Sequence, residues 1–287
     1  MTVSDPAGAD RTGLDAPGKA RALHEARRTR VPIAPFTDAD PTLGMAEGYA
    51  VQRELLDLLL ADGERVVGRK VGLTSTAMQR VIGVDSPDHG PVLASTVYRD
   101  GDALPLDRFI APKVEAEIVF VMGERLLGPG VGPTDAARAV AGVAASMEIV
   151  DSRIADWRIK LADTVADLAS NGAVAVSSRV VPLEGLDTRL IGMTLTRNGE
   201  LVDTGAGAAA LGDPLAVVAW LANVLGEHGV ALEPGHLVMT GALHAAVPMA
   251  AGEVWRAEFD RLGPVSIRVT AGDGATGDGA TGDGVAA

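Results

Sequence analysis

The chain of 287 residues is predicted to be an α+β protein, with a mixed, largely antiparallel β-sheet core and a small N-terminal helical lobe. Three observations lead to this class. Helical periodicity is concentrated in roughly the first sixty residues. Short β-type runs outnumber helices in the second half, where turn signals recur between them. The composition is 47% hydrophobic but only 3% aromatic, so the chain can form a core, which must be aliphatic and alanine-rich.

Helical patterns dominate the N-terminal part. The first helix is expected over residues 19–30. The second, over residues 43–61, keeps an apolar stripe that includes Met45, Tyr49 and Leu55. A strand is expected over residues 66–73, followed by a short helix that Thr74 or Ser75 can cap and that ends near residue 83.

The middle of the chain alternates between extended and helical patterns. Asp100-Gly101 predicts a turn before an extended region over residues 108–122. Pro133 opens a helix that reaches about Val140, and a strand follows near residues 144–150.

Turn and cap residues define the elements of the second half. Asn198-Gly199 predicts a hairpin between strands at residues 193–196 and 201–204. Asp213 as N-cap and Pro214 as first residue begin a helix to about residue 227. Short strands are expected over residues 236–240, 253–259 and 265–269.

Four regions follow from these patterns. Residues 1–18 and 271–287 are rich in small and polar residues, and the second repeats Gly-Asp-Gly-Ala-Thr, so both are expected to be disordered. Residues 19–63 form the helical lobe, and residues 64–270 form the α+β domain that carries the chemistry.

Composition excludes several classes of function. The formal charge of −13 argues against a nucleic-acid partner. The absence of cysteine excludes disulfides, a thiolate nucleophile and zinc–sulfur sites. The N-terminus does not have the pattern of a signal peptide, and no apolar run approaches membrane-spanning length, so a cytoplasmic protein is expected.

The most informative stretch is an apolar run that contains two acids. Glu115 and Glu117 project from one face of a strand, roughly 7 Å apart, while the alternate residues form an apolar face. Val119 and Val121 continue the acidic face as apolar, so that face is covered at one end. Because two unpaired carboxylates repel and are costly to bury, a divalent cation would stabilise them. An acid/base couple and a solvated amphipathic strand remain as alternatives.

A third acid, Glu148, lies in another apolar strand-like run and is expected to be either ion-paired or a ligand. With Glu115 and Glu117 it would form an all-oxygen set of the kind that suits Mg²⁺ or Mn²⁺. The glycine-rich run at residues 205–210 imitates a dinucleotide loop, but no βαβ unit surrounds it, so no nucleotide cofactor is predicted.

Several motifs occur together in the order found in a known family. They are Gly68-Arg69-Lys70-Val71-Gly72-Leu73-Thr74-Ser75, Pro87-Asp88-His89-Gly90, Val114-Glu115-Ala116-Glu117-Ile118, Glu148-Ile149-Val150-Asp151-Ser152-Arg153-Ile154, Asp156-Trp157, Asp163-Thr164-Val165-Ala166-Asp167 and Thr240-Gly241-Ala242-Leu243. From about residue 20 to 269 the chain resembles the 2-keto-4-pentenoate (2-hydroxypenta-2,4-dienoate) hydratases, in the hydratase/decarboxylase branch of the fumarylacetoacetate hydrolase superfamily.

This resemblance implies a β-sheet core of the fumarylacetoacetate hydrolase C-terminal type and a metal-dependent lyase of aromatic meta-cleavage pathways. The three glutamates would be the Mg²⁺ or Mn²⁺ ligands. Lys70 would lie by the substrate carboxylate or enolate oxygen, and Asp88 would serve in proton transfer. Ser170, Thr240 and Gly241 are the expected substrate contacts.

The implied reaction is hydration of 2-hydroxypenta-2,4-dienoate to 4-hydroxy-2-oxopentanoate, by protonation at C5 and then addition of water at C4. The alternatives are decarboxylation of 2-oxo-3-hexenedioate (4-oxalocrotonate) and a non-catalytic partner subunit. The segment at residues 240–248 favours the hydratase. The expected partners are the small dienoate substrate, further copies in a homo-oligomer, and a downstream aldolase.

The chain departs from the family pattern at two positions. Leu168 stands where the family has an asparagine, and this change is expected to remove a polar group near the pocket. His89 follows Asp88 where the family has an aromatic residue.

Overall fold

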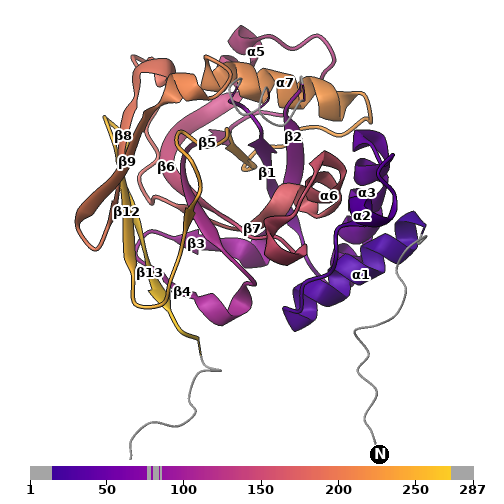
Figure 1. Cartoon of the computed structure of the whole chain (residues 1–287). Helices are drawn as coiled ribbons and strands as arrows, with labels where there is room; N and C mark the ends of the chain where they lie inside the picture. Colours follow the sequence, from indigo (N-terminus) through magenta and orange to yellow (C-terminus); the bar gives the residue numbers. More distant parts are fainter. Residues whose placement is uncertain (1–14, 76–78, 80–83, 85, 273–287) are drawn as a thin grey trace, which may run out of the picture.

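A strongly curved sheet forms the centre of the computed structural model, which describes residues 15–75, 79, 84 and 86–272 (Figure 1). Its strands follow the order β2-β1-β10-β5-β6-β7-β3, and β11 pairs with β5 beside this path. Their bounds are β1 Val66–Gly72, β2 Asp88–Leu93, β3 Val97–Arg99, β5 Lys113–Met122, β6 Val140–Val150, β7 Asn171–Val176, β10 Leu237–Met239 and β11 Val247–Pro248. Most neighbouring strands of this sheet are antiparallel. The pairs β1–β10 and β3–β7 are parallel.

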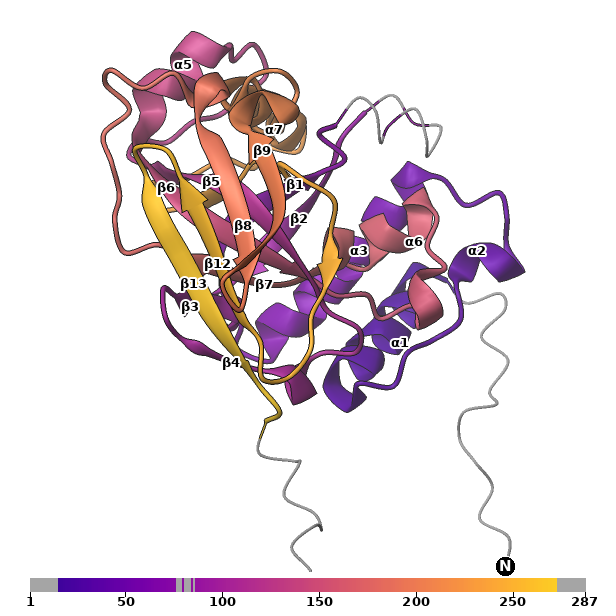
Figure 2. The same cartoon turned by 60° about the vertical axis from the view of Figure 1, so that its left-hand side comes forward.

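A second sheet of five strands packs on the first, in the order β4-β13-β12-β8-β9. Its strands are β4 Ala103–Pro105, β8 Gly192–Arg197, β9 Glu200–Ala206, β12 Val254–Phe259 and β13 Gly263–Thr270. Figure 2 shows the second sheet lying along the flank of the curved one. One apolar cluster joins the two sheets, with Phe120 and Ile118 from β5 and Trp255 from β12 fully buried in it.

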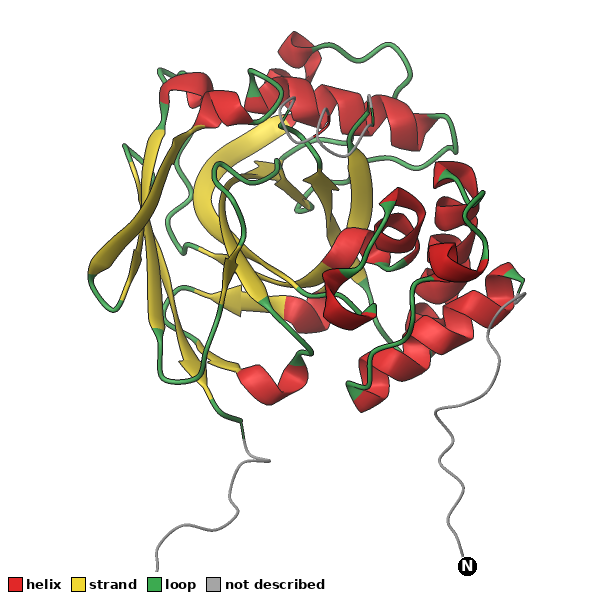
Figure 3. Ribbon diagram, in the orientation of Figure 1, coloured by secondary structure: helices red, strands yellow, loops and turns green. Residues whose placement is uncertain are grey.

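Helices cover one end and one flank of the sheets (Figure 3). Helices α5 (Pro133–Ala139) and α7 (Pro214–Gly226) lie across the end. Helices α1 (Ala16–Thr29), α2 (Phe36–Ala39), α3 (Met45–Ala61) and α6 (Leu161–Ala166) lie on the flank. The mixed, mainly antiparallel α+β architecture with an N-terminal helical segment confirms the predicted fold class.

The flanking helices share a core with the sheet-bearing part of the chain. Leu23 of α1 and Leu55 of α3 pack with Leu93, Ile154 and Leu168. A polar tether adds to this packing, since the Thr37 hydroxyl donates to Asp163 of α6 at 2.6 Å. The helical segment therefore supports α6 and the turn after it, which line the candidate site.

Most of the predicted elements are present, with shifted ends. Asn198 and Gly199 both have positive φ, as a tight hairpin turn between β8 and β9 requires. The side chain of Asp213 caps α7 by accepting from the Leu215 amide at 3.0 Å. Helix α1 begins at Ala16, earlier than predicted, because Asp15 caps it. The extended region begins at Lys113 rather than at residue 108.

Other elements could not be recognised from their sequences. Strand β2 contains Gly90-Pro91, a dipeptide that is typical of turns. Proline is tolerated at this position because β2 is an edge strand. Asp88 is the first residue of β2. Strand β7 begins with Asn171-Gly172, which also resembles a turn. The short helix predicted up to residue 83 and most of both predicted disordered ends lie outside the described residues.

One stretch corrects the prediction about membrane-spanning runs. Gly207–Gly226 is long and apolar enough to cross a membrane by length and composition. Its α-helical part, α7, has 13 residues, which span about 20 Å against a hydrocarbon core of about 30 Å. Val217, Val218 and Leu221 of α7 are buried in the main core, as expected for a core helix.

Candidate active site

Three glutamates converge where β5 pairs with β6. Glu115 of β5 stands directly opposite Glu148 of β6 in the antiparallel register, and Glu117 projects from the same face two residues along. One carboxylate oxygen from each of the three lies within 4.8 Å of the others. The predicted carboxylate set is thus brought together by strand register alone.

Different partners hold each carboxylate. Glu117 accepts a hydrogen bond from the Gly241 amide at 2.9 Å. Glu148 accepts one from the Asn171 side-chain amide at 2.9 Å, and its other oxygen is buried with no hydrogen-bond partner among the described residues. Glu115 is half-buried and lines the cavity beside the other two glutamates. One buried carboxylate oxygen is therefore available as a ligand.

Electrostatic repulsion in this group is strong. Burial and the neighbouring Glu148 carboxylate raise the pKa of Glu115 to about 7. Burial, Glu148 and Glu115 together raise the pKa of Glu117 well above its usual range. Without another cation, the folded protein therefore favours protonated glutamates at this position.

The site fits a hard divalent cation. Three carboxylates with free oxygen lone pairs supply the ligand type that Mg²⁺ and Mn²⁺ prefer, and no histidine or cysteine belongs to the group. A cation there would offset the repulsion and use the unpartnered oxygen of Glu148. These residues could therefore hold one such ion.

Lys70 of β1 reaches the same group from the neighbouring part of the sheet. Its Nζ lies 3.4 Å from Glu148 Oε1 and donates a hydrogen bond to the Ala169 carbonyl at 2.8 Å. Burial alone would lower the pKa of Lys70, but the carboxylates around it, with Glu148 first, outweigh burial and raise it. The ammonium is therefore charged and fixed in position.

Asp88 of β2 is the fourth acid in the cavity. It pairs with Gly72 of β1, and a side-chain carbon on Gly72 would lie 2.2 Å from Asp88 Oδ1 and 3.2 Å from Lys70 Nζ. Only glycine at this position lets the two polar groups approach. Burial raises the pKa of Asp88 although Lys70 opposes the shift, and its Oδ1 has no hydrogen-bond partner among the described residues. Asp88 can therefore hold or release a proton there.

The three glutamates, Lys70 and Asp88 all line one cavity of about 560 Å³. Ser170 and Gly241, two of the predicted substrate contacts, also line it. Thr240 does not, because its fully buried hydroxyl donates to the Ile118 carbonyl at 2.8 Å and holds β10 against β5. Its placement supports a structural role.

An unusual turn shapes one wall of the cavity. Leu168, Ala169 and Ser170 all have φ near +55°, a conformation that costs energy for residues other than glycine and that often occurs at functional sites. The turn aims the Ala169 carbonyl at Lys70 and places the Ser170 hydroxyl 3.0 Å from that of Thr164. Leu168 itself is buried among the flanking helices, next to Ala169 and Ser170 of the cavity lining but not part of that lining.

The two histidines of the motifs have different environments. His89 stacks on Tyr49 with ring centroids 4.6 Å apart, away from the cavity lining. Burial lowers the pKa of His89 to about 3, so it is neutral. His244 lines the cavity, and its Nε2 accepts a hydrogen bond from the Ala116 amide between the two glutamates of β5, at 2.7 Å. This positioning role was not predicted, since it depends on contact between distant segments.

A buried ion pair supports the strand that carries Glu148. Arg153 binds Asp167 through its backbone amide, at 2.8 Å, and through its guanidinium. The ion-pair partner of Arg153 is thus Asp167, while Lys160 lines the cavity. Another contact missed from the sequence is Asn171, whose amide holds Glu148.

We expect Mg²⁺ to stabilise the protein more at about pH 8 than at about pH 5.5. In the metal-free protein the folded state retains protons on Glu115 and Glu117 that the unfolded chain releases near pH 4.5. Folding stability therefore falls as pH rises through about 7. A divalent cation displaces those protons, so its affinity rises over the same window. Melting temperatures with and without Mg²⁺ across this range measure the effect.

The variant Glu117→Gln should lose this pH-dependent gain, whereas Glu124→Gln, at an exposed position beyond the end of β5, should keep it. A magnesium-induced shift that is equal at both pH values would contradict the assignment of these carboxylates as ligands.

Comparisons with known proteins find similar sequences over most of the chain. The family model of the fumarylacetoacetate (FAA) hydrolase C-terminal region matches residues 72–270. The chain is 42% identical to 2-keto-4-pentenoate hydratase of Paraburkholderia xenovorans (strain LB400), over 86% of this chain and 91% of that protein. It is 44% identical to 2-keto-4-pentenoate hydratase of Burkholderia vietnamiensis (strain G4 / LMG 22486), over 86% and 94%.

A solved structure is similar over the same region. The 4-oxalocrotonate decarboxylase from Pseudomonas putida G7, complexed with magnesium and adipate, superposes with a TM-score of 0.85 at 36% identity. The superposition covers 88% of this chain and 97% of that one.

Proposed function

Since this chain belongs to the fumarylacetoacetate hydrolase family, in the branch that contains the 2-keto-4-pentenoate hydratases, we propose that it hydrates 2-hydroxypenta-2,4-dienoate to 4-hydroxy-2-oxopentanoate. The observation that carries the proposal is the cavity in which Glu115, Glu117 and Glu148 meet beside Lys70 and Asp88. A set of carboxylates suited to a divalent cation, a fixed ammonium and a buried titratable acid are the groups that this hydration needs.

The three glutamates would hold Mg²⁺ or Mn²⁺, which supplies Lewis acidity toward the carboxylate and C2 oxygen of a 2-oxo or 2-hydroxy acid. Lys70 is charged and fixed by the Ala169 carbonyl, so it can stabilise negative charge that develops on the C2 oxygen. Ser170 and Gly241 line the cavity and would orient the substrate.

Asp88 is the proposed acid/base group. Because burial raises its pKa, it can carry the proton that C5 of the dienol must receive. That protonation, with loss of the proton from the C2 hydroxyl, converts the dienol into a 2-oxo-3-enoate, whose C4 is electrophilic. Water then adds at C4, and C3 receives the second proton. We place the first proton at Asp88 Oδ1, which has no hydrogen-bond partner in the described part of the chain.

Decarboxylation of 2-oxo-3-hexenedioate is the second candidate function, because the similar solved structure is a 4-oxalocrotonate decarboxylase. Both reactions would use the same glutamates and Lys70, so these residues do not discriminate between them. The hydratase is favoured by the higher identity to curated hydratases, 42% and 44% against 36%.

The pathway, the extent of the catalytic unit and the homo-oligomer are also proposals. We place the reaction in cytoplasmic meta-cleavage catabolism of aromatic compounds, before an aldolase that would consume 4-hydroxy-2-oxopentanoate. The catalytic unit would be residues 64–270, since every residue lining the cavity lies within it. Exposed Leu190 and Leu201 are available for contacts in a homo-oligomer.

Supplying the two substrates separately to the Mg²⁺-loaded or Mn²⁺-loaded protein tests the proposed reaction. We expect 4-hydroxy-2-oxopentanoate from the pentadienoate and no release of CO₂ from the hexenedioate, both followed by NMR. Release of CO₂ without hydration of the pentadienoate would establish the decarboxylase instead. No turnover of either compound, together with absence of metal binding, would indicate a non-catalytic subunit.

A further inference from the structure

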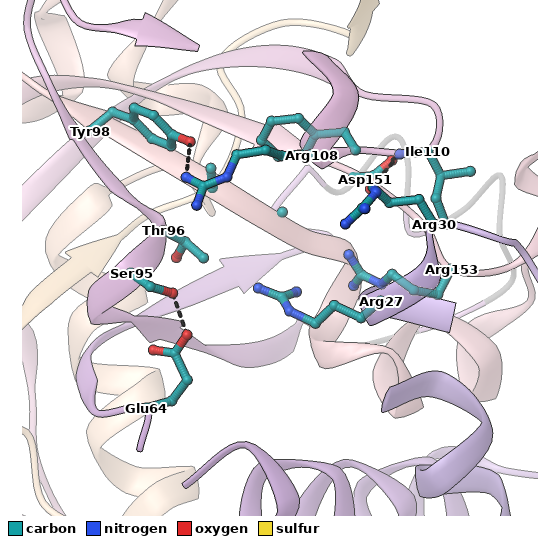
Figure 4. Close-up of a pocket in the computed structure, with 13 residues that line it drawn as sticks. Arg27, Arg30, Glu64, Ser95, Thr96, Tyr98, Arg108, Ile110, Asp151 and Arg153 are labelled. Carbon is teal, nitrogen blue, oxygen red and sulfur yellow. Dashed lines mark hydrogen bonds between the residues drawn. The ribbon is translucent and has the colours of Figure 1, made fainter. Parts of the chain in front are cut away.

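A second cavity, of about 180 Å³, shares no lining residue with the candidate active site. It lies between α1, the 3₁₀ turns η2 (Ala94–Thr96) and η3 (Leu106–Arg108), and the segment after β6. Four arginines line it, namely Arg27, Arg30, Arg108 and Arg153. Figure 4 shows their side chains facing a shared space from different elements of the fold.

Three of these arginines have no carboxylate partner in the described part of the chain. Arg153 is neutralised by its buried ion pair with Asp167. Arg108 makes only a hydrogen bond to the Tyr98 hydroxyl, at 3.1 Å. The guanidinium groups of Arg27 and Arg30 form neither an ion pair nor a hydrogen bond with any residue that the structure describes.

The acids that line this pocket are engaged elsewhere. Asp151 accepts hydrogen bonds from the backbone amides of Ile110 and Ala111, the second at 2.8 Å. Glu64 accepts one from the Ser95 hydroxyl. Neither carboxylate lies within ion-pair distance of an arginine of the pocket. Three arginines without an ion pair against these two carboxylates leave the pocket with a net positive charge, although the whole chain has a formal charge of −13.

The charged guanidinium of Arg27 lies in an electrostatically unfavourable position. Burial, and then the like charge of Arg153, lower the pKa of Arg27 to about 10, although the nearby carboxylates of Asp167, Glu64 and Asp151 oppose the shift. A guanidinium that is desolvated beside a second guanidinium is costly unless an anion balances it. Arg27 belongs to the last turn of α1, Arg30 is the left-handed residue that caps the end of this helix, and Arg108 lies across the pocket.

We propose that this pocket binds a small polyvalent oxyanion of the phosphate class. Guanidinium groups that approach from different sides match an anion with several acceptor oxygens better than a single planar carboxylate. The volume of about 180 Å³ is below the usual 300–1,000 Å³ of sites for larger organic ligands, so it suits a small ion. Free phosphate and the phosphoryl group of a metabolite share this chemistry.

Calorimetric titration of the Mg²⁺-loaded full chain tests the proposal, with inorganic phosphate in one arm and glycerol 3-phosphate in the other. Ionic strength is matched with NaCl. We expect saturable binding of at least one probe, weakened about tenfold or more in Arg27→Met and in Arg108→Met. The control Arg21→Met, at an exposed position of the same helix, should bind as the wild type does. Binding of glycerol 3-phosphate alone would identify the phosphorylated metabolite as the source.

A stability measurement separates binding from a structural role. Without phosphate, Arg27→Met should melt at the same temperature as the wild type or higher, because an unpaired desolvated charge is removed. Absence of saturable binding would overturn the proposal. So would equal affinity in the two pocket variants and the wild type, or loss of binding in Lys70→Met alone, which would place the anion in the catalytic cavity.

Discussion

Replacing Glu148 by glutamine is expected to reduce turnover and divalent-metal affinity by about a hundredfold or more, while the fold survives. Loss of a group that only orients a metal ligand already lowers metal affinity or activity about 10–100-fold, so loss of a ligand itself should lower them more. Glu148 stands opposite Glu115, lies 3.4 Å from Lys70 and carries a buried oxygen that has no hydrogen-bond partner among the described residues. Glutamine keeps the shape but removes the charge. Calorimetric titration with Mg²⁺ or Mn²⁺ and a turnover assay measure the two losses.

The stability of this variant without metal provides an independent check. Removing one of several mutually repelling buried carboxylates should leave the melting temperature unchanged or raise it. Glu115→Gln and Glu117→Gln should behave in the same way, and exposed Glu124→Gln should bind metal normally. Unchanged metal affinity in all three cavity variants would refute the assignment of the ligands.

Replacing Lys70 by methionine is expected to reduce turnover about a hundredfold or more, the scale seen when a preorganised charge-stabilising group is removed. Methionine fills most of the side-chain volume, but it cannot donate to the Ala169 carbonyl or offset charge on the substrate. Metal affinity should be retained or increased, since a competing cation is removed from beside Glu148. Steady-state kinetics and calorimetry on the same preparation separate the two effects.

Lys113→Met is the matched control for Lys70. Lys113 lies at the start of β5, over the ring of Trp157 and outside the cavity lining, so its loss should change turnover only slightly. Near-normal kinetics in Lys70→Met, or parallel loss of metal binding and turnover, would assign Lys70 a structural role instead.

The acidic face of β5 could be predicted from the sequence because strand alternation is a local property. Two glutamates separated by one residue must share a face once the segment is extended, and β5 is extended over both. The hairpin at Asn198-Gly199 and the cap at Asp213 were predictable for the same reason, since each depends on a few adjacent residues.

Features that depend on distant segments could not be predicted from residue patterns. The pairing of Glu115 with Glu148 requires the register between β5 and β6, which is determined along their whole length. The positive φ of Leu168, Ala169 and Ser170 has no local signal, because none of these residues favours that conformation. The arginine-lined pocket likewise combines α1 with residues more than a hundred positions away, including Arg153.

The most direct test of the central claim is proton NMR of the product that the Mg²⁺-loaded protein forms from 2-hydroxypenta-2,4-dienoate in D₂O. The proposed reaction yields 4-hydroxy-2-oxopentanoate with deuterium at C5, because C5 takes its proton from exchangeable sites before water adds at C4. Glu148→Gln should form this product far more slowly. A product without a C4 hydroxyl, one without deuterium at C5, or normal turnover in Glu148→Gln would contradict the account.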